Sequence, residues 1–214
     1  MIDDAIEFAD NPEPRWPMVL LLDTSEAIRG APLGELLSGL RKFRNWLAQG
    51  IMSSRAEVAV VQFGNTVNIL QEFASPKSFV LPALQAGGHR RCVSEALVQV
   101  LEMISVRKAH YRSKGISYFM PLIFLIVAGD PNGEPQESIR RVANLIRVEE
   151  SKFHFILLVL GLESANLNPW GQFAIMKPGK LSELDLGDML LVHQNRQEYL
   201  DYLATLRPDR DQKA

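Results

Sequence analysis

The chain has 214 residues, 47% of them hydrophobic, which is enough apolar material for the core of one domain. A net charge of -2 excludes a general attraction to nucleic acid or to an anionic membrane surface. Cys92 is the one cysteine, so an internal disulfide is excluded and a reducing compartment is favoured. The first residues are acidic, unlike a signal peptide, and no apolar run reaches the roughly 18 residues of a membrane span. We therefore expect a soluble, cytoplasmic protein.

Short apolar runs that end in turn-forming residues predict the strands of one sheet. Three of them are almost continuously apolar, as is typical of strands buried on both faces: Pro17–Asp23, Pro121–Ala128 and Phe153–Leu160. Val58–Phe63 and Val67–Gln71 flank the turn Gly64-Asn65, which predicts a hairpin.

Helical spacing of apolar residues separates these strands. The segments with this spacing are Pro32–Leu47, Val93–Ile104, Ile139–Ile146 and a closing stretch, Leu186–Leu203. Alternating strands and helices predict an α/β fold with a mostly parallel sheet, one antiparallel edge strand and helices on both faces. We expect a flexible acidic arm over residues 1–15, one domain over 16–206 and a flexible tail over 207–214.

A ligand site in such a sheet lies beyond the carboxyl ends of the strands. The loops that follow Asp23 and Val127 meet there, and we expect the loop Gly87–Val93 beside them.

Several segments in register resemble the von Willebrand factor A (vWA) family. They are Leu20–Pro32, with Gly30-Ala31-Pro32 opening a helix; Gly87-Gly88 followed by Ala96-Leu97; and Met120–Leu125 followed by Gly129-Asp130-Pro131. They look most like the small bacterial members of the tellurium-resistance type. The resemblance implies a three-layer, Rossmann-like fold and a role in protein recognition.

The family binds a magnesium-type ion at its metal-ion-dependent adhesion site (MIDAS), through a strand ending in Asp-x-Ser-x-Ser plus a Thr and a second Asp. By this resemblance Asp23 and Ser25 match the first two ligands. Ala27, Arg91 and Ala128 stand at the other three positions. Since a hard divalent ion prefers several oxygens, at least one or two of them carboxylates, we predict a degenerate site.

The basic run His89-Arg90-Arg91 suggests what replaces the ion. Arg91, or a neighbouring basic residue, could pair with Asp23 and hold the loops together without metal. The alternative is that all three side chains are solvated at the rim.

We expect no cofactor, but a magnesium site remains an alternative. Asp130 or Glu26 would have to swing inward and complete a site with Asp23 and Ser25.

Enzymatic chemistry is disfavoured by the motifs that are missing. A phosphotransferase with a strand-end aspartate nucleophile needs a second acid two residues later, where Ser25 stands. Neither a phosphate-binding glycine loop nor a G-x-S-x-G turn follows any strand. We expect Cys92 to be a buried residue at a helix start and His154 to be a core or sheet-face residue. For Trp170 we expect packing in the core in preference to the alternative, an exposed side chain that anchors an interface.

We therefore expect a non-enzymatic protein-interaction module, and the resemblance to the small bacterial members implies an adaptor in a stress, defence or signalling system. Its expected partner is a protein, and neither nucleic acid nor a membrane; the same resemblance implies a kinase- or phosphatase-like protein. The predicted binding surface comprises Glu26, His89, Arg90, Arg91 and Asp130. A structural subunit of a larger assembly is the remaining alternative.

Overall fold

The computed structural model describes residues 13–186 of the chain. The predictions for residues 1–12 and for the tail lie outside this range, and so does the closing helix beyond Leu186. Arg15 is already part of the fold: it is buried, and its backbone N–H donates to the carbonyl of Ser117 at 2.9 Å. Within the described range no helix is long and apolar enough to cross a membrane.

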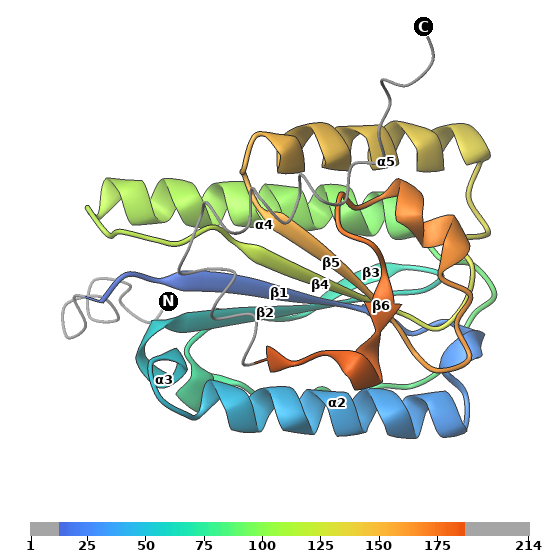
Figure 1. The fold of residues 1–214 in the computed structure, drawn as a ribbon, viewed down its shortest axis with the longest axis horizontal. Helices are drawn as coiled ribbons and strands as arrows, with labels where there is room; N and C mark the ends of the chain where they lie inside the picture. The colour runs from blue at the N-terminus through green and yellow to red at the C-terminus, as the bar shows by residue number, and fades with distance from the viewer. Residues whose placement is uncertain (1–12, 187–214) are drawn as a thin grey trace, which may run out of the picture.

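Strands and helices alternate along the chain (Figure 1). The strands are β1 (Trp16–Asp23), β2 (Ala56–Phe63), β3 (Val67–Ala74), β4 (Leu122–Val127), β5 (Ile156–Gly161) and β6 (Gly179–Lys180). The α-helices are α2 (Ala31–Leu47), α3 (Met52–Arg55), α4 (Val93–Ser113) and α5 (Gln136–Ser151). Short 3-10 helices are η1 (Glu26–Ile28), η2 (Pro76–Ser78), η3 (Asn168–Gln172) and η4 (Leu181–Glu183).

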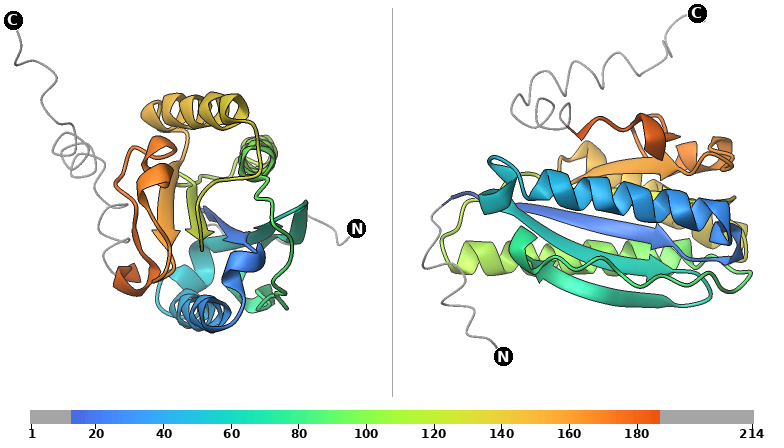
Figure 2. Two further views of the ribbon diagram at one scale, coloured as in Figure 1. Left: turned by 90° about the vertical axis from the view of Figure 1, so that its right-hand side faces the viewer. Right: turned by 90° about the horizontal axis from the view of Figure 1, so that it is seen from below.

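The strands form one six-stranded sheet in the order β3-β2-β1-β4-β5-β6. All neighbours pair in parallel except β3, which runs antiparallel to β2 at one edge. Helix α2 covers one face, and α4 and α5 lie side by side on the other (Figures 1 and 2). The predicted fold is confirmed. The sequence did not indicate β6, whose two residues carry too short a pattern.

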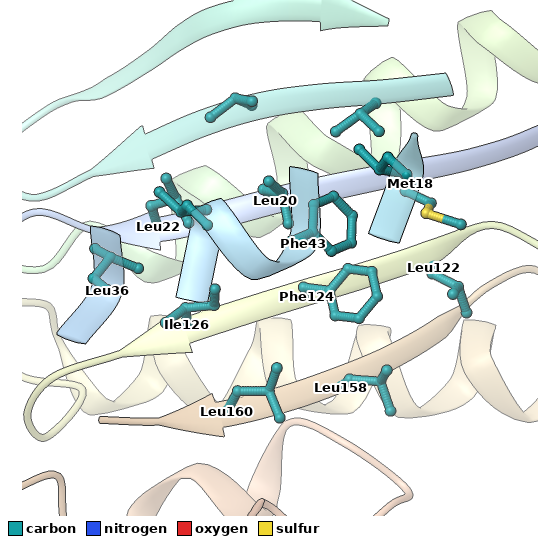
Figure 3. Packing of buried hydrophobic residues seen from close by; sticks show 14 of the residues in the cluster. Met18, Leu20, Leu22, Leu36, Phe43, Leu122, Phe124, Ile126, Leu158 and Leu160 are labelled. Carbon is teal, nitrogen blue, oxygen red and sulfur yellow. The ribbon is translucent and has the colours of Figure 1, made fainter. Parts of the chain in front are cut away.

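Alternate residues of β1 serve two separate cores, which explains why its whole length is apolar. Leu20 faces the core under α2, whereas Leu21 faces the core under α4 and α5. Phe43 of α2 packs against Phe124 of β4, with ring centroids 5.5 Å apart (Figure 3). Trp170 is fully buried in the second core, as predicted.

The prediction for the start of β5 was wrong. The strand begins at Ile156, because Phe153 adopts a positive φ of 61° and closes the turn after α5. His154 is consequently not a core or sheet-face residue: its side chain is exposed, with Nδ1 2.6 Å from Glu149 Oε2.

A buried carboxylate, Glu150, fastens the end of α5 to the sheet. Its two oxygens accept backbone N–H bonds from Leu157 of β5 and from Ile175, both at 2.9 Å. Burial disfavours the anion and raises the pKa of Glu150 to about 7, although the two backbone bonds act in the opposite direction.

Glu150 should make the stability of the fold depend on pH. Because its pKa is higher in the folded chain than in the unfolded one, its contribution is complete below pH 4.5 and is lost as the pH rises through 7. The difference in unfolding free energy between wild type and Glu150→Gln should therefore fall by about 2–3 kcal/mol from pH 4 to pH 8. Urea denaturation across this range measures it. Glu137→Gln, an exposed change on the same helix, is the control, and a constant difference for Glu150→Gln would contradict the prediction.

Candidate functional site

Three loops meet at the carboxyl ends of the parallel strands, and we call them the top loops. They are the loop after β1 (residues 24–30), the loop before α4 (87–92) and the loop after β4 (128–135). Backbone hydrogen bonds join them: Glu26 N–H donates to the carbonyl of Gly88 at 2.8 Å, and Arg91 N–H to that of Asn132 at 3.1 Å.

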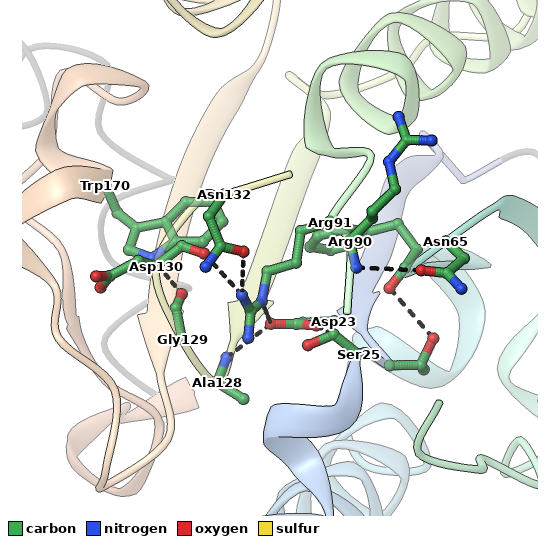
Figure 4. A network of polar contacts seen from close by, with 12 residues as sticks. Asp23, Ser25, Asn65, Arg90, Arg91, Ala128, Gly129, Asp130, Asn132 and Trp170 are labelled. Carbon is green, nitrogen blue, oxygen red and sulfur yellow. Dashed lines mark hydrogen bonds and ion pairs between the residues drawn. The ribbon is translucent and has the colours of Figure 1, made fainter. Parts of the chain in front are cut away.

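Asp23, the last residue of β1, lies at the centre of the top loops and is 1% exposed. Its Oδ1 accepts the N–H of Ser25 at 2.9 Å. Its Oδ2 accepts two donors at 3.1 Å, the backbone N–H of Ala128 and Nε of Arg91 (Figure 4). Both oxygens of the carboxylate are therefore bonded within the protein.

Arg91, in the loop before α4, bonds to the end of β1 and to the loop after β4. Besides its bond to Asp23, its Nη1 donates to the carbonyl of Asp130 at 3.0 Å and to Oδ1 of Asn132 at 2.6 Å (Figure 4). The residue is 7% exposed. Gly129 leaves room for it, since a Cβ there would lie 2.6 Å from Nη2. Of the two alternatives for the basic run, the structure contains the pairing of Arg91 with Asp23.

The other two basic residues of the run point outward. His89 and Arg90 are exposed. The backbone N–H of Arg90 donates to Oδ1 of Asn65 and its Nε to the carbonyl of Gly133, each at 3.1 Å, so the exposed guanidinium is held in place.

The two carboxylates that could have completed a metal site lie elsewhere. Asp130 is exposed and directs its carbonyl, not a side-chain oxygen, to Arg91. Glu26 forms an ion pair with Arg29, with one contact of 2.9 Å between Nη2 and Oε2. The hydrogen bond from Arg29 is the largest influence that lowers the pKa of Glu26, and the charge of His89 acts in the same direction.

Sequence reasoning missed three polar residues that complete the site. Asn132 accepts from Arg91, Asn65 from Arg90, and the carboxylate of Glu134 accepts the N–H of Ser94 at the start of α4 at 3.0 Å. The pairs Gly64-Asn65 and Asn132-Gly133 are turn signals, and asparagine at a turn often bonds to nearby backbone. That signal marks the turns but does not name their partners.

Cys92 is a buried structural residue. It is 4% exposed, and its Sγ donates to the carbonyl of Asn65 at 3.3 Å. Burial is the main cause that raises the pKa of the thiol, although the positive charge of Arg90 acts against it. The group therefore stays protonated and is a poor nucleophile.

The strand order and the polar centre at the strand ends define a doubly wound α/β domain with its site above the sheet. The family model described as the von Willebrand factor type A domain matches residues 18–174, and the chain belongs to this family. No curated protein sequence matches the chain.

Solved structures with this fold include three with TM-scores of 0.52. The ArnB paralog VWA2 from Sulfolobus acidocaldarius is 19% identical, over 80% of this chain and 43% of its own. Proximal thread matrix protein 1 from the mussel byssus is 16% identical, over 85% and 48%. Manganese-loaded TRAP of Plasmodium vivax is 17% identical, over 77% and 64%. The chain thus spans 43% to 64% of the length of these proteins, and at such identities the likeness concerns the fold.

The residues around Asp23 do not fit the divalent ion that the family implies. Ala27 and Ala128 offer no side-chain oxygen, and the guanidinium of Arg91 lies against the carboxylate where a cation would have to bind. The side-chain oxygen that remains at the family's ligand positions besides Asp23 is Ser25 Oγ, which is buried without a hydrogen-bond partner among the described residues. Residues 13–186 contain no cluster of three or more His, Cys, Asp or Glu that could hold a metal.

Removing the cation at residue 91 should destabilise the domain. Arg91→Met leaves Asp23 buried with an unpaired charge, so we expect the unfolding free energy to fall by about 3–5 kcal/mol. Arg90→Met removes an exposed cation nearby and should cost about 1 kcal/mol or less. Chemical denaturation of both variants makes the comparison. Equal stabilities would show that the pair does not hold the loops, whereas a recovery in Asp23→Asn/Arg91→Met would support the unpaired charge as the cause.

Cys92 should resist modification in the folded chain. Since it is the one thiol, an aromatic disulfide reagent such as Ellman's reagent at pH 8 reports it without background. We expect modification at least about a hundredfold slower in native buffer than in denaturant, because the thiol is buried and its pKa is raised. Rapid modification of the native chain would show that the top loops open readily.

Proposed function

We propose that this chain is a non-enzymatic protein-recognition module that binds its partner through the exposed part of the top loops and needs no metal ion. The observation that carries this proposal is the buried contact of 3.1 Å between Arg91 Nε and Asp23 Oδ2. The guanidinium supplies the positive charge that Asp23 requires, and it reaches Asp23 from the chain itself.

Recognition is favoured over catalysis by the state of the two candidate nucleophiles. Both oxygens of Asp23 accept hydrogen bonds inside the protein, and Cys92 is buried with a raised pKa. Neither group is placed to attack a substrate, which supports a binding function.

The partner surface is specified by the charges that remain exposed. His89 and Arg90 lie on the outside of the loop before α4, while Asp130 is exposed on the loop after β4 and Glu26 is partly exposed on the loop after β1. Arg91 is not available to a partner, because its side chain is 8% exposed and bonded on several sides. Such a mixed surface selects a partner of complementary charge, with a carboxylate or phosphate opposite Arg90.

The resemblance to small bacterial members of the family supports an adaptor role in a stress, defence or signalling system in the cytoplasm, with a kinase- or phosphatase-like protein as the partner. In this role the chain holds a second protein in place and carries out no chemistry of its own.

A binding experiment without metal tests the proposal. The immobilised chain captures its partner from a lysate of the source organism, and the purified pair is then titrated in EDTA and in Mg²⁺. We expect equal affinities in the two buffers and a loss of at least about tenfold for His89→Glu/Arg90→Glu.

Arg41→Glu/Lys42→Glu, which reverses two adjacent exposed charges on α2, is the matched control and should bind as wild type. Binding that requires Mg²⁺, or that survives the reversal of His89 and Arg90, would refute the proposal.

A further inference from the structure

A second surface of the domain, away from the top loops, carries apolar side chains that are only partly covered. A groove of about 530 Å³ lies between edge strand β3 and helix α4. Ile69 and Phe73 of β3 line one side, and Met103 and Val106 of α4 line the other. Val106 is 65% exposed and Ile69 36% exposed.

Helix α4 has more apolar surface than its contact with the sheet requires. Its buried residues, which include Leu97, Val100 and Ile104, face the core. Val98 and Val106 lie outside this buried stripe and are 47% and 65% exposed, whereas Met103 at its edge is partly buried against the core. A helix on the surface of a domain usually carries one apolar stripe, so the additional residues on α4 indicate a second contact.

The position of β3 explains where that contact would lie. On this face of the sheet α4 and α5 lie side by side, and β3 is the edge strand next to α4 (Figure 2, left). A further helix beside α4 would continue the helix layer over β3 and would bury the side chains of Ile69 and Phe73.

Charge gives the chemistry of the occupant. Glu72 and Glu102 lie on the two sides of the groove, and Glu95 lies nearer the start of α4. All three are exposed, and none has an ion-pair or hydrogen-bond partner in the described part of the chain. Arg107, which also lines the groove, is bound to Glu57, with Nη2 2.7 Å from Oε2. The groove therefore combines four apolar side chains with the exposed carboxylates of Glu72 and Glu102, and Gln99 and His110 of α4 also line it.

We propose that the groove between β3 and α4 binds a short amphipathic helix of a partner protein, with apolar residues on one side and lysine or arginine on its flanks. The lining of α4 runs from Gln99 to His110 and rises about 16 Å, which suits a helix of about three turns. This surface is separate from the top loops, so the inference does not depend on the proposed function.

A designed peptide tests the groove directly. The probe is a fluorescent 14-residue peptide of leucine and lysine with leucines at helical spacing; the controls are a scrambled peptide of the same composition and a leucine–glutamate counterpart. Fluorescence anisotropy should show saturable binding of the first peptide alone. Amide shifts of the ¹⁵N-labelled chain should fall on both β3 and α4.

Matched variants locate the site. Val106→Asn and Glu102→Lys should each weaken binding about fivefold or more. Val148→Asn and Glu137→Lys, equivalent exposed changes on α5, should leave it unchanged. Circular dichroism and thermal melting check that all four variants fold. His89→Glu/Arg90→Glu should bind the probe as wild type, which separates this site from the top loops.

Several results would overturn the inference. They are equal binding of the scrambled or acidic peptide, an affinity that Val106→Asn and Glu102→Lys do not change, shifts confined to β3 alone, and no saturable binding of the probe. Sedimentation of the chain without peptide tests whether the chain binds to itself through the groove. A dimer that Val106→Asn dissociates would assign the groove to a second copy of the chain.

Discussion

The upper end of this domain depends on one buried ion pair. Asp23 ends the central strand β1 and is 1% exposed, and a buried carboxylate is tolerated only when its charge is balanced and its oxygens are bonded. Arg91 balances the charge and also bonds to Asp130 and Asn132, so the same side chain fixes the loop after β4. The arrangement of the top loops thus follows from satisfying one carboxylate.

A cation that belongs to the chain differs in kind from a bound ion. It cannot dissociate, and its donors are directed at fixed acceptors in the loop after β4. The exposed Arg90 next to it is held by its own bonds to Asn65 and Gly133. The fold leaves a second surface open for a different reason. Helix α4 packs beside edge strand β3 without filling the groove between Phe73 and Val106. Together, the two surfaces suit a module that contacts more than one protein segment.

The sequence by itself was sufficient for the fold class and for five of the six strands. Strands buried on both faces must be apolar along their whole length, so β1, β4 and β5 were visible as continuous runs, and Gly64-Asn65 marked the hairpin. The order of strands and helices then placed the site at the carboxyl ends. The resemblance to the vWA family then assigned Asp23, Ala27 and Ala128 their positions in it.

The tertiary structure alone decided which basic side chain turns inward. His89, Arg90 and Arg91 are adjacent cations with no periodic pattern around them, and their directions depend on acceptors that lie about 40 to 70 residues away in sequence. The role of Asn132 was hidden for the same reason. Contacts across the sheet, and not local preference, set the direction of a loop side chain. The sequence therefore determined where the site would lie, and the packing of three loops determined which residues form it.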